Sequence, residues 1–278
     1  MNIAEVIKVI FYGIVEGITE WLPVSSTGHL ILFESFWPLI QSEEFMEMFR
    51  VVIQLGAILA VCVLYFERLN PFSRKHSPEQ KQEILGIWTK VVVGCVPAGV
   101  LGVLLNDWFD EHFYRWQVVA FTLILYGVLF ILLENRNRDR KPRVKNFRRL
   151  TLPMALLIGC FQVLSLVPGT SRSGSTILGA MLFDVARPVA AEFSFFMAIP
   201  IMFGASLLKI VKHGLAFSGT ELFVLFLGMA VAFGVSILTI RFLMDYIRRK
   251  DFKAFGYYRI VLGVLVIAYF GIRAAIGA

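Results

Sequence analysis

The chain of 278 residues is too apolar for a water-soluble domain, because 58% of its residues are hydrophobic and 17% are charged, against about 25% charged residues in soluble proteins. A net charge of +7 raises the question of nucleic-acid binding. The basic residues lie between apolar runs, however, which is where membrane topology places them. We therefore expect a membrane protein with no nucleic-acid partner.

Six apolar runs are long enough to cross a bilayer as helices, which takes about 17 to 25 residues. In chain order they are 49–66, 84–105, 116–133, 193–210, 221–243 and 257–276. Two other apolar regions, 3–22 with 24–40 and 150–167 with 173–186, are broken by Pro and Gly and carry polar residues. We predict that each of these two regions forms a re-entrant helical hairpin. The expected fold is an all-α polytopic membrane protein with ten helical segments.

The basic residues divide the loops between the six spans into two sets. Loops 67–83, 134–149 and 244–256 together hold sixteen Lys and Arg residues, whereas loops 106–115 and 211–220 hold two. Cytoplasmic loops carry the excess of Lys and Arg in membrane proteins. The first set is therefore predicted to lie in the cytoplasm.

This orientation divides the single membrane domain, 1–278, into halves 1–140 and 150–278. Each half is a hairpin followed by three spans, and an odd number of spans inverts the second half relative to the first. A weak repeat supports the division, because GIVEGITEWLPVSSTG (13–28) aligns without gaps to GCFQVLSLVPGTSRSG (159–174). Inverted repeats that meet at broken helices often build a polar site near the membrane midplane.

The first polar motif, EGITEWLPVSSTGH, begins with two acidic residues. Glu16 and Glu20 are four positions apart, so they share one face of a helix. Carboxylates inside a membrane are costly and need a divalent cation, a basic partner or a proton. The alternative is that both residues lie at the membrane interface on the end of a snorkelling helix.

The same motif continues with a helix break and a cluster of hydroxyls. Pro23 ends the first helix, and Ser25, Ser26 and Thr27 follow at the start of the next one. The free N–H groups at such a helix start form an anion site. His29 falls in the first turn of that helix, near Ser26.

The second polar motif is PGTSRSGST, residues 168–176. Gly169 allows close approach of the backbone, and Arg172 offers a planar fork that suits a phosphate group. The hydroxyls beside them include Ser171, Ser173 and Thr176. The motif therefore predicts a phosphate-binding loop. The alternative is that Arg172 forms only a structural ion pair with Glu16 or Glu20.

Three further polar residues lie in apolar segments. Gln54 and Glu192 occupy span positions that could face the same cavity, and Gln162 aligns with Glu16 in the repeat.

At the two motifs the sequence resembles the undecaprenyl-diphosphatase family, also called bacitracin-resistance proteins. The resemblance rests on residues 16–29 and 168–176 and extends through VIQLGAILAV (52–61) and EFSFFMAIP (192–200) along essentially the whole chain. It implies hydrolysis of undecaprenyl diphosphate to undecaprenyl phosphate and inorganic phosphate, which recycles the cell-wall carrier lipid. It also implies a divalent cation, Mg²⁺ or Ca²⁺, and a bacterial plasma membrane with the site open to the extracytoplasmic side.

The resemblance assigns roles to residues of both motifs. The catalytic set it implies is Glu16, Glu20, Ser26, His29 and Arg172. The substrate-binding set is Ser25, Thr27, Gly169, Ser171, Ser173 and Thr176. Glu16 and Glu20 would also hold the cation. We favour Ser26 as the nucleophile, with His29 assisting proton transfer, over direct attack by a cation-bound water.

Two other functions compete with this one. A polyprenyl-phosphate or anion transporter could use the same site, because inverted repeats with broken helices are common among carriers. A type-2 phosphatidic-acid phosphatase would need a histidine soon after its Ser-Arg motif, and none occurs between Thr176 and His213. The expected partners are the bilayer and a polyprenyl diphosphate lipid, and a homodimer is compatible with them.

Overall fold

A computed structural model describes residues 2–214 and 217–275 of the chain. Within these residues the structure is helical, and its one β feature is an isolated bridge between Val144 and Val185. The α-helices are α1 (Ile3–Thr19), α2 (Ser26–Phe36), α3 (Glu43–Leu64), α4 (Phe66–Leu69), α5 (Pro78–Phe113), α6 (Trp116–Asn137), α7 (Leu152–Val163), α8 (Arg172–Leu182), α9 (Arg187–His213), α10 (Gly219–Ile247) and α11 (Lys253–Ala275). Two short 3-10 helices, η1 (Phe147–Arg149) and η2 (Leu164–Leu166), complete the order.

Six of the described helices are long and apolar enough to cross a membrane: α3, the Pro78–Leu105 part of α5, α6, α9, α10 and α11. Four of the six predicted spans lie entirely within these helices. Span 49–66 runs past Leu64, the end of α3, to the start of α4, and residue 276 of span 257–276 lies outside the described residues. The prediction of an all-helical multi-pass protein is confirmed. Large apolar side chains such as Phe121 and Leu238 are exposed on these helices, as expected of surfaces that face lipid. The predicted segment boundaries need two corrections: residues 106–113 continue helix α5 rather than forming a loop, and α4 adds one turn to the ten expected segments.

Two pairs of short helices correspond to the broken apolar regions of the sequence. The first break (residues 20–25) separates α1 from α2, and the second break (residues 164–171) separates α7 from α8. Each break ends in a serine with positive φ, 74° at Ser25 and 72° at Ser171. Each of these side chains accepts a hydrogen bond from a glycine N–H three residues later, at Gly28 and Gly174. The two breaks therefore have the same local geometry at the positions that the repeat aligns.

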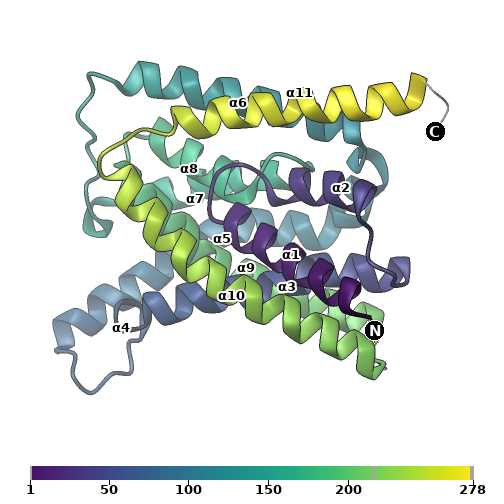
Figure 1. Ribbon diagram of the computed structural model, residues 1–278. Helices are drawn as coiled ribbons and strands as arrows, with labels where there is room; N and C mark the ends of the chain where they lie inside the picture. Colours follow the sequence, from purple (N-terminus) through teal and green to yellow (C-terminus); the bar gives the residue numbers. More distant parts are fainter. Residues whose placement is uncertain (1, 215–216, 276–278) are drawn as a thin grey trace.

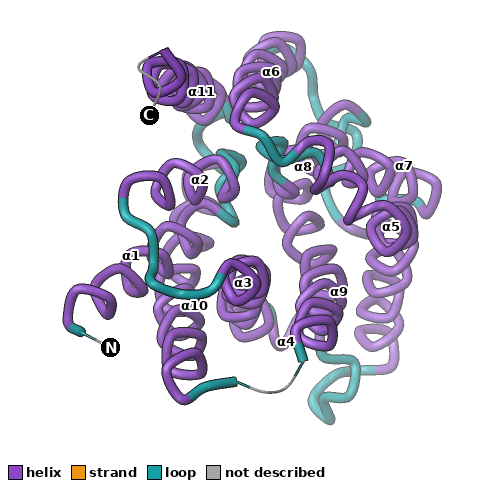
Figure 2. The backbone as a smooth tube through the Cα atoms, turned by 90° about the vertical axis from the view of Figure 1, so that its right-hand side faces the viewer, coloured by secondary structure: helices purple, strands orange, loops and turns teal. Residues whose placement is uncertain are grey.

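The long helices surround these short pairs. Helices α6 and α11 lie side by side along one edge in both views (Figures 1 and 2). Helix α10 packs on α1 and α3, while α5 packs on α7 and α9, and α3 contacts α9 between the two groups. The three basic connections, around α4, between α6 and α7, and between α10 and α11, gather at the left end of Figure 1. The loops predicted to be cytoplasmic thus share one end of the molecule.

Glycines let several of these helices approach closely. A Cβ atom at Gly56 of α3 would overlap the main chain of Met229 in α10. In the α6–α11 pair, a Cβ at Gly127 would lie 2.7 Å from the carbonyl oxygen of Gly256, and one at Gly256 would lie 2.8 Å from that of Gly127. Small residues are the usual means of close packing between membrane helices, where no hydrophobic effect drives association.

We expect Gly56→Ala to destabilise the protein, because its methyl group would push α3 away from α10. Overpacking of this kind costs about 1–3 kcal/mol, so the midpoint of thermal unfolding in detergent should fall. Gly204→Ala in α9 is the control, because nothing lies within 4 Å of the added atom. Equal unfolding midpoints for the two variants would contradict the close packing of α3 on α10.

Candidate active site

At the two helix breaks, residues of both polar motifs bond the carboxylate of Glu20. Arg172 donates to Oε1 of Glu20 from Nη2 at 2.9 Å and from Nε at 3.3 Å. The hydroxyl of Ser26 donates to the other oxygen, Oε2, at 3.2 Å. Ser26 and Arg172 are the first residues of α2 and α8, so the N-termini of both helices meet at Glu20. The predicted meeting of Glu20 with Arg172 is confirmed.

Arg172 is held by several elements at once. Its Nη1 donates to the carbonyl oxygen of Ser194 in α9 at 2.8 Å and contacts the Ser194 hydroxyl at 3.3 Å. The guanidinium carbon lies 5.9 Å from the ring centroid of Trp21, which is fully buried. The guanidinium therefore has one defined position, and the side chain remains 10% exposed. The ion pair with Glu20 was the structural alternative for Arg172, and it exists in this structure.

Glu16 lies one helical turn before Glu20 and has no exposed surface. Neither of its carboxylate oxygens has a hydrogen-bond partner within the described part of the chain. The Glu20 carboxyl and the Arg172 guanidinium both act electrostatically on it. The alternative of a snorkelling helix end is therefore wrong for Glu16 and for Glu20, which is 6% exposed. Gln162, at the aligned position of the repeat, is also buried with both polar atoms unpaired.

The pair of Glu16 and Glu20 fits a divalent cation that takes few ligands from the protein. No group of three or more His, Cys, Asp or Glu side chains gathers among the described residues. Mg²⁺ commonly binds one or two carboxylates and takes its other ligands from water and substrate phosphates. Glu16, with two unpaired oxygens, and Glu20 provide such a pair. A closed protein cage for the metal would not fit this donor set.

His29 does not contact the Ser26 hydroxyl, contrary to our expectation. Its Nδ1 lies 2.7 Å from the carbonyl oxygen of Ser25, and its Nε2 lies 2.6 Å from the hydroxyl of Tyr258 in α11. Because a carbonyl oxygen only accepts, Nδ1 carries the proton, and Nε2 of the neutral ring accepts from Tyr258. The two rings stack at 9°. Both nitrogens are engaged, so His29 supports the backbone before Ser26.

The other predicted hydroxyls hold the two breaks in shape. Ser173 donates to the main-chain oxygen of Glu20 at 3.0 Å, and Thr176 donates to that of Arg172 at 2.6 Å. Ser25 and Ser171 cap α2 and α8. Gly169 has a φ of 86°, and a Cβ there would overlap the Thr122 hydroxyl. Their roles toward substrate stay predictions, because these contacts are all internal.

Ser26 and Thr27 line a cavity of about 460 Å³. The cavity extends along α3 and the last turns of α5 and α9, where its charged lining residues are Glu43, Glu47, Arg50, Glu111 and Lys209. The first turns of α3 and the last turns of α5 and α9 lie away from the basic connections in Figure 1. Gln54 also lines the cavity, so its predicted position is confirmed. The expectation for Glu192 is wrong, because its carboxylate lies 2.7 Å from Arg68 at the basic end.

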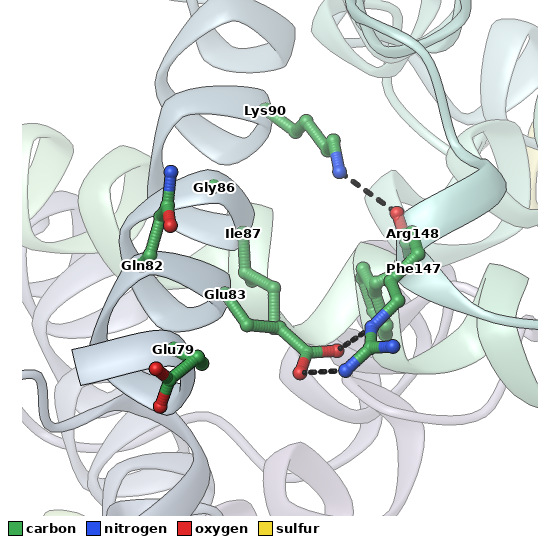
Figure 3. A pocket seen from close by; sticks show the side chains of 8 residues that line it. All are labelled: Glu79, Gln82, Glu83, Gly86, Ile87, Lys90, Phe147 and Arg148. Atoms are coloured by element: carbon green, nitrogen blue, oxygen red, sulfur yellow. Dashed lines mark hydrogen bonds and ion pairs between the residues drawn. The ribbon is translucent and has the colours of Figure 1, made fainter. Parts of the chain in front are cut away.

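A second hollow, of about 250 Å³, lies between α5 and η1 (Figure 3). Glu83 accepts two hydrogen bonds from Arg148, at 3.0 and 2.9 Å. Lys90 donates to the carbonyl oxygen of Phe147 at 2.8 Å. These charged groups are paired with each other or with the backbone, and none of the predicted site residues lines the hollow. We therefore assign the site to the cavity at Ser26.

Sequence analysis missed two residues of α11 that reach this region. Tyr258 bonds His29, and Arg259 lies fully buried against both helix breaks. An arginine inside an apolar span is itself a signal, since charged residues within membrane helices are rare and usually functional. Arg259 falls within the predicted span 257–276, and this signal could have identified it.

Comparison with known proteins places the chain in a family. Residues 9–265 match the family described as bacitracin resistance protein BacA. The undecaprenyl-diphosphatase of Acetivibrio thermocellus is 60% identical over 266 residues, which are 96% of this chain and 98% of that protein. The undecaprenyl-diphosphatase of Desulfitobacterium hafniense is 55% identical over the full length of both chains, and that of Lactiplantibacillus plantarum is 57% identical over 96% of this chain and 98% of that protein. The chain belongs to the bacitracin resistance protein BacA family.

Proposed function

We propose that the protein hydrolyses undecaprenyl diphosphate to undecaprenyl phosphate and inorganic phosphate. The observation that carries this proposal is the meeting of the Ser26 hydroxyl and the Arg172 guanidinium on the two oxygens of Glu20. The proposed nucleophile and the phosphate-binding fork then both lie within hydrogen-bonding distance of the carboxylate base. Relatives at 55–60% identity carry the name of this activity.

The site has the charges that a lipid diphosphate needs. The N-termini of α2 and α8 converge there, and free N–H groups at helix starts favour phosphate. Arg172 binds Glu20 in this structure through Nε and Nη2, the edge that also suits two phosphate oxygens. An incoming terminal phosphate would share this edge with Glu20. Phosphoryl transfer depends mainly on such positioning and charge stabilisation.

Ser26 is our proposed nucleophile, and Glu20 rather than His29 is its proposed base. The Ser26 hydroxyl already donates to Glu20. As Oγ bonds to the terminal phosphorus, its proton passes to Glu20 and the bond from phosphorus to the bridging oxygen breaks, which releases undecaprenyl phosphate. Glu20 then releases this proton to the solvent. Water attacks the phosphorus of the phosphoserine and gives a proton to Glu20, the bond from phosphorus to Ser26 Oγ breaks, and Glu20 returns the proton to Oγ as inorganic phosphate leaves. Direct attack by water would use the same base.

We propose that Glu16 and Glu20 hold a divalent cation, Mg²⁺ or Ca²⁺, when the substrate is bound. Such a cation would neutralise charge on the diphosphate oxygens. The support is the buried Glu16 carboxylate, which has no other partner among the described residues. A cation there would let both carboxylates remain ionised inside the protein.

We also propose that the two short helix pairs are re-entrant hairpins and that the halves form an inverted repeat. At about 1.5 Å per residue, the 11 residues of α2 or α8 span about 16 Å, roughly half of the hydrocarbon core. The packing is reciprocal, since α1 lies on α10 of the second half and α7 lies on α5 of the first half. The matched Ser25 and Ser171 geometry supports the same relation.

The active site is proposed to open to the extracytoplasmic side of a bacterial plasma membrane. The support is the cavity at Ser26, which extends toward the end of the molecule opposite the basic connections. Those connections are cytoplasmic by the distribution of Lys and Arg.

Purified protein in detergent should release inorganic phosphate from a C55 lipid diphosphate. Glu20→Gln and Ser26→Ala should each lower kcat by about 10²–10⁴-fold, the usual range for loss of a general base and a comparable loss for a nucleophile. Ser35→Ala, in the same helix as Ser26, is the control, because its hydroxyl bonds only the carbonyl oxygen of Ile31. Near-normal turnover by Ser26→Ala would remove the covalent step. Lipid movement across vesicles without phosphate release would instead indicate a transporter.

A chelator should abolish phosphate release, and added Mg²⁺ or Ca²⁺ should restore it. Glu16→Gln should weaken cation binding, measured by equilibrium dialysis with ⁴⁵Ca²⁺, because one of two carboxylates is lost. Glu44→Gln, at an exposed position at the start of α3, is the matched control. Full activity in the presence of chelator would show that the metal assignment is wrong.

Tyr258→Phe should lower kcat by about fivefold, because it keeps the stacked ring but loses one hydrogen bond of about 1 kcal/mol to His29. Tyr257→Phe tests the same change on an exposed neighbour of the same helix and should leave kcat unchanged. A Tyr258→Phe enzyme with unaltered kcat would mean that the orientation of His29 does not affect the reaction.

A further inference from the structure

Arg259 is the most unusual charged residue outside the proposed catalytic set. Its side chain has no exposed surface, although it lies within the apolar helix α11. Its guanidinium donates hydrogen bonds to five main-chain carbonyl oxygens, those of Gly169 (2.8 Å), Thr170 (3.0 Å), Pro23 (3.1 Å), Thr122 (3.4 Å) and Leu123 (3.4 Å). Pro23 belongs to the first helix break, and Gly169 and Thr170 belong to the second. One side chain therefore joins both breaks to helix α6.

The charge of Arg259 has no acidic partner. No carboxylate of the described residues lies within ion-pair distance of it, and its guanidinium carbon lies 5.3 Å from the ring centroid of Tyr126. A buried charge is tolerated only where other groups replace its hydration. Carbonyl dipoles and an aromatic face replace it here. The positive charge is therefore not cancelled by a neighbour.

The charge of Arg259 lies close to the start of α8, which carries Arg172. A Cβ at Gly174, in the first turn of α8, would lie 3.1 Å from Nη1 of Arg259. The guanidinium thus lies against the helix start that carries Arg172. A cation placed at a helix N-terminus opposes the helix dipole, which destabilises the empty site. It adds to the positive potential when a phosphate group binds at the same helix start.

Close packing of α11 on α6 fixes the position of Arg259 relative to the two helix breaks. Gly256 and Gly263 lie about one turn before and after it. Cβ atoms there would lie 2.8 Å from the oxygen of Gly127 and 3.0 Å from that of Ala120. Helix α11 therefore has no room to move away from α6. Arg259 reaches both breaks from a rigid support.

We propose that Arg259 is a positioning residue that sets the separation of the two phosphate-binding breaks and supplies part of their positive charge. It acts through Pro23 on the segment before Ser26, and through Gly169 and Thr170 on the segment before Arg172. The nucleophile and the phosphate fork come from segments more than 140 residues apart in sequence (|i−j| = 152 for Glu20 and Arg172). Their alignment depends on a group that contacts both. The catalytic part of this inference rests on the proposed function.

The test uses the full-length protein and the variant Arg259→Ala, which leaves a space lined by carbonyl oxygens. Hydrogen exchange measured by mass spectrometry should be faster than in the native protein in peptides that cover residues 20–28 and 167–174. The kcat for phosphate release should fall by about 10²-fold, the loss expected when reacting groups shift by about 1 Å. Arg273→Ala, at the far end of the same helix, where the guanidinium contacts Tyr269, should change neither quantity.

Added guanidinium and urea then separate charge from shape, because the two molecules have similar size and only guanidinium is cationic. Millimolar guanidinium should slow the exchange of both peptides in Arg259→Ala and recover part of kcat, whereas equal urea should do neither. Equal recovery by urea would overturn the charge role. Native exchange and native kcat in folded Arg259→Ala would overturn the whole inference.

Arg259→Lys keeps the proposal testable if the alanine variant does not fold. Lysine keeps the charge but lacks the planar fork, so it cannot join both breaks at once. We expect a lower kcat with KM changed much less, because substrate charge is still matched while alignment is lost. A native kcat in Arg259→Lys would contradict the positioning role. Absence of phosphate release by the native protein would refute the proposed function, while the exchange data would still test the contacts of Arg259 with the two breaks.

Discussion

The ion pair between Glu20 and Arg172 joins residues that are 152 positions apart and nearly buried within an apolar protein. Neither charge would be stable alone in that environment, because isolated charges inside a membrane lose their hydration. Bringing the two together requires that both helices be broken at the same depth. The serine caps, the positive φ angles and the glycine contacts of the two breaks all serve this arrangement. The pairing of these two charges also brings the starts of α2 and α8 together.

The buried polar groups around this pair fall into two kinds. The hydroxyls of Ser173 and Thr176, and the fork of Arg259, bond main-chain oxygens and so maintain the shape of the breaks. Ser26 lines the cavity, the Arg172 side chain keeps some exposure, and Glu16 has unpaired oxygens. Only the second kind is positioned to meet a ligand. A polar residue in a motif is therefore not by itself a substrate contact, and its hydrogen bonds decide which kind it is.

The two motifs differ in their side chains although the backbones of their helix breaks match at the serine caps. Ser26 and Arg172 occupy the same position after the aligned caps Ser25 and Ser171, so one helix start carries a hydroxyl, our proposed nucleophile, and the other carries a cation. Glu16 and Gln162 are likewise aligned, buried and unpaired, but only Glu16 carries a carboxylate. Two helix breaks of similar backbone geometry thus give an asymmetric site because their side chains differ. The two helix dipoles remain alike and both favour an anion.

The sequence alone determined the six apolar helices, the grouping of the basic loops into one set and the residues of both polar motifs, because apolar length, charge distribution and helix-breaking residues are local properties. It also led to the pairing of Glu20 with Arg172, since each charge needed a partner. Tertiary structure alone decided that His29 turns to Tyr258, that Glu192 pairs with Arg68, and that Arg259 reaches both breaks. These contacts join residues far apart in the chain, and the choice among partners depends on which helices pack together. Helix packing in a membrane depends on shape at glycine contacts such as Gly56 with Met229, and no periodicity in the sequence encodes that choice.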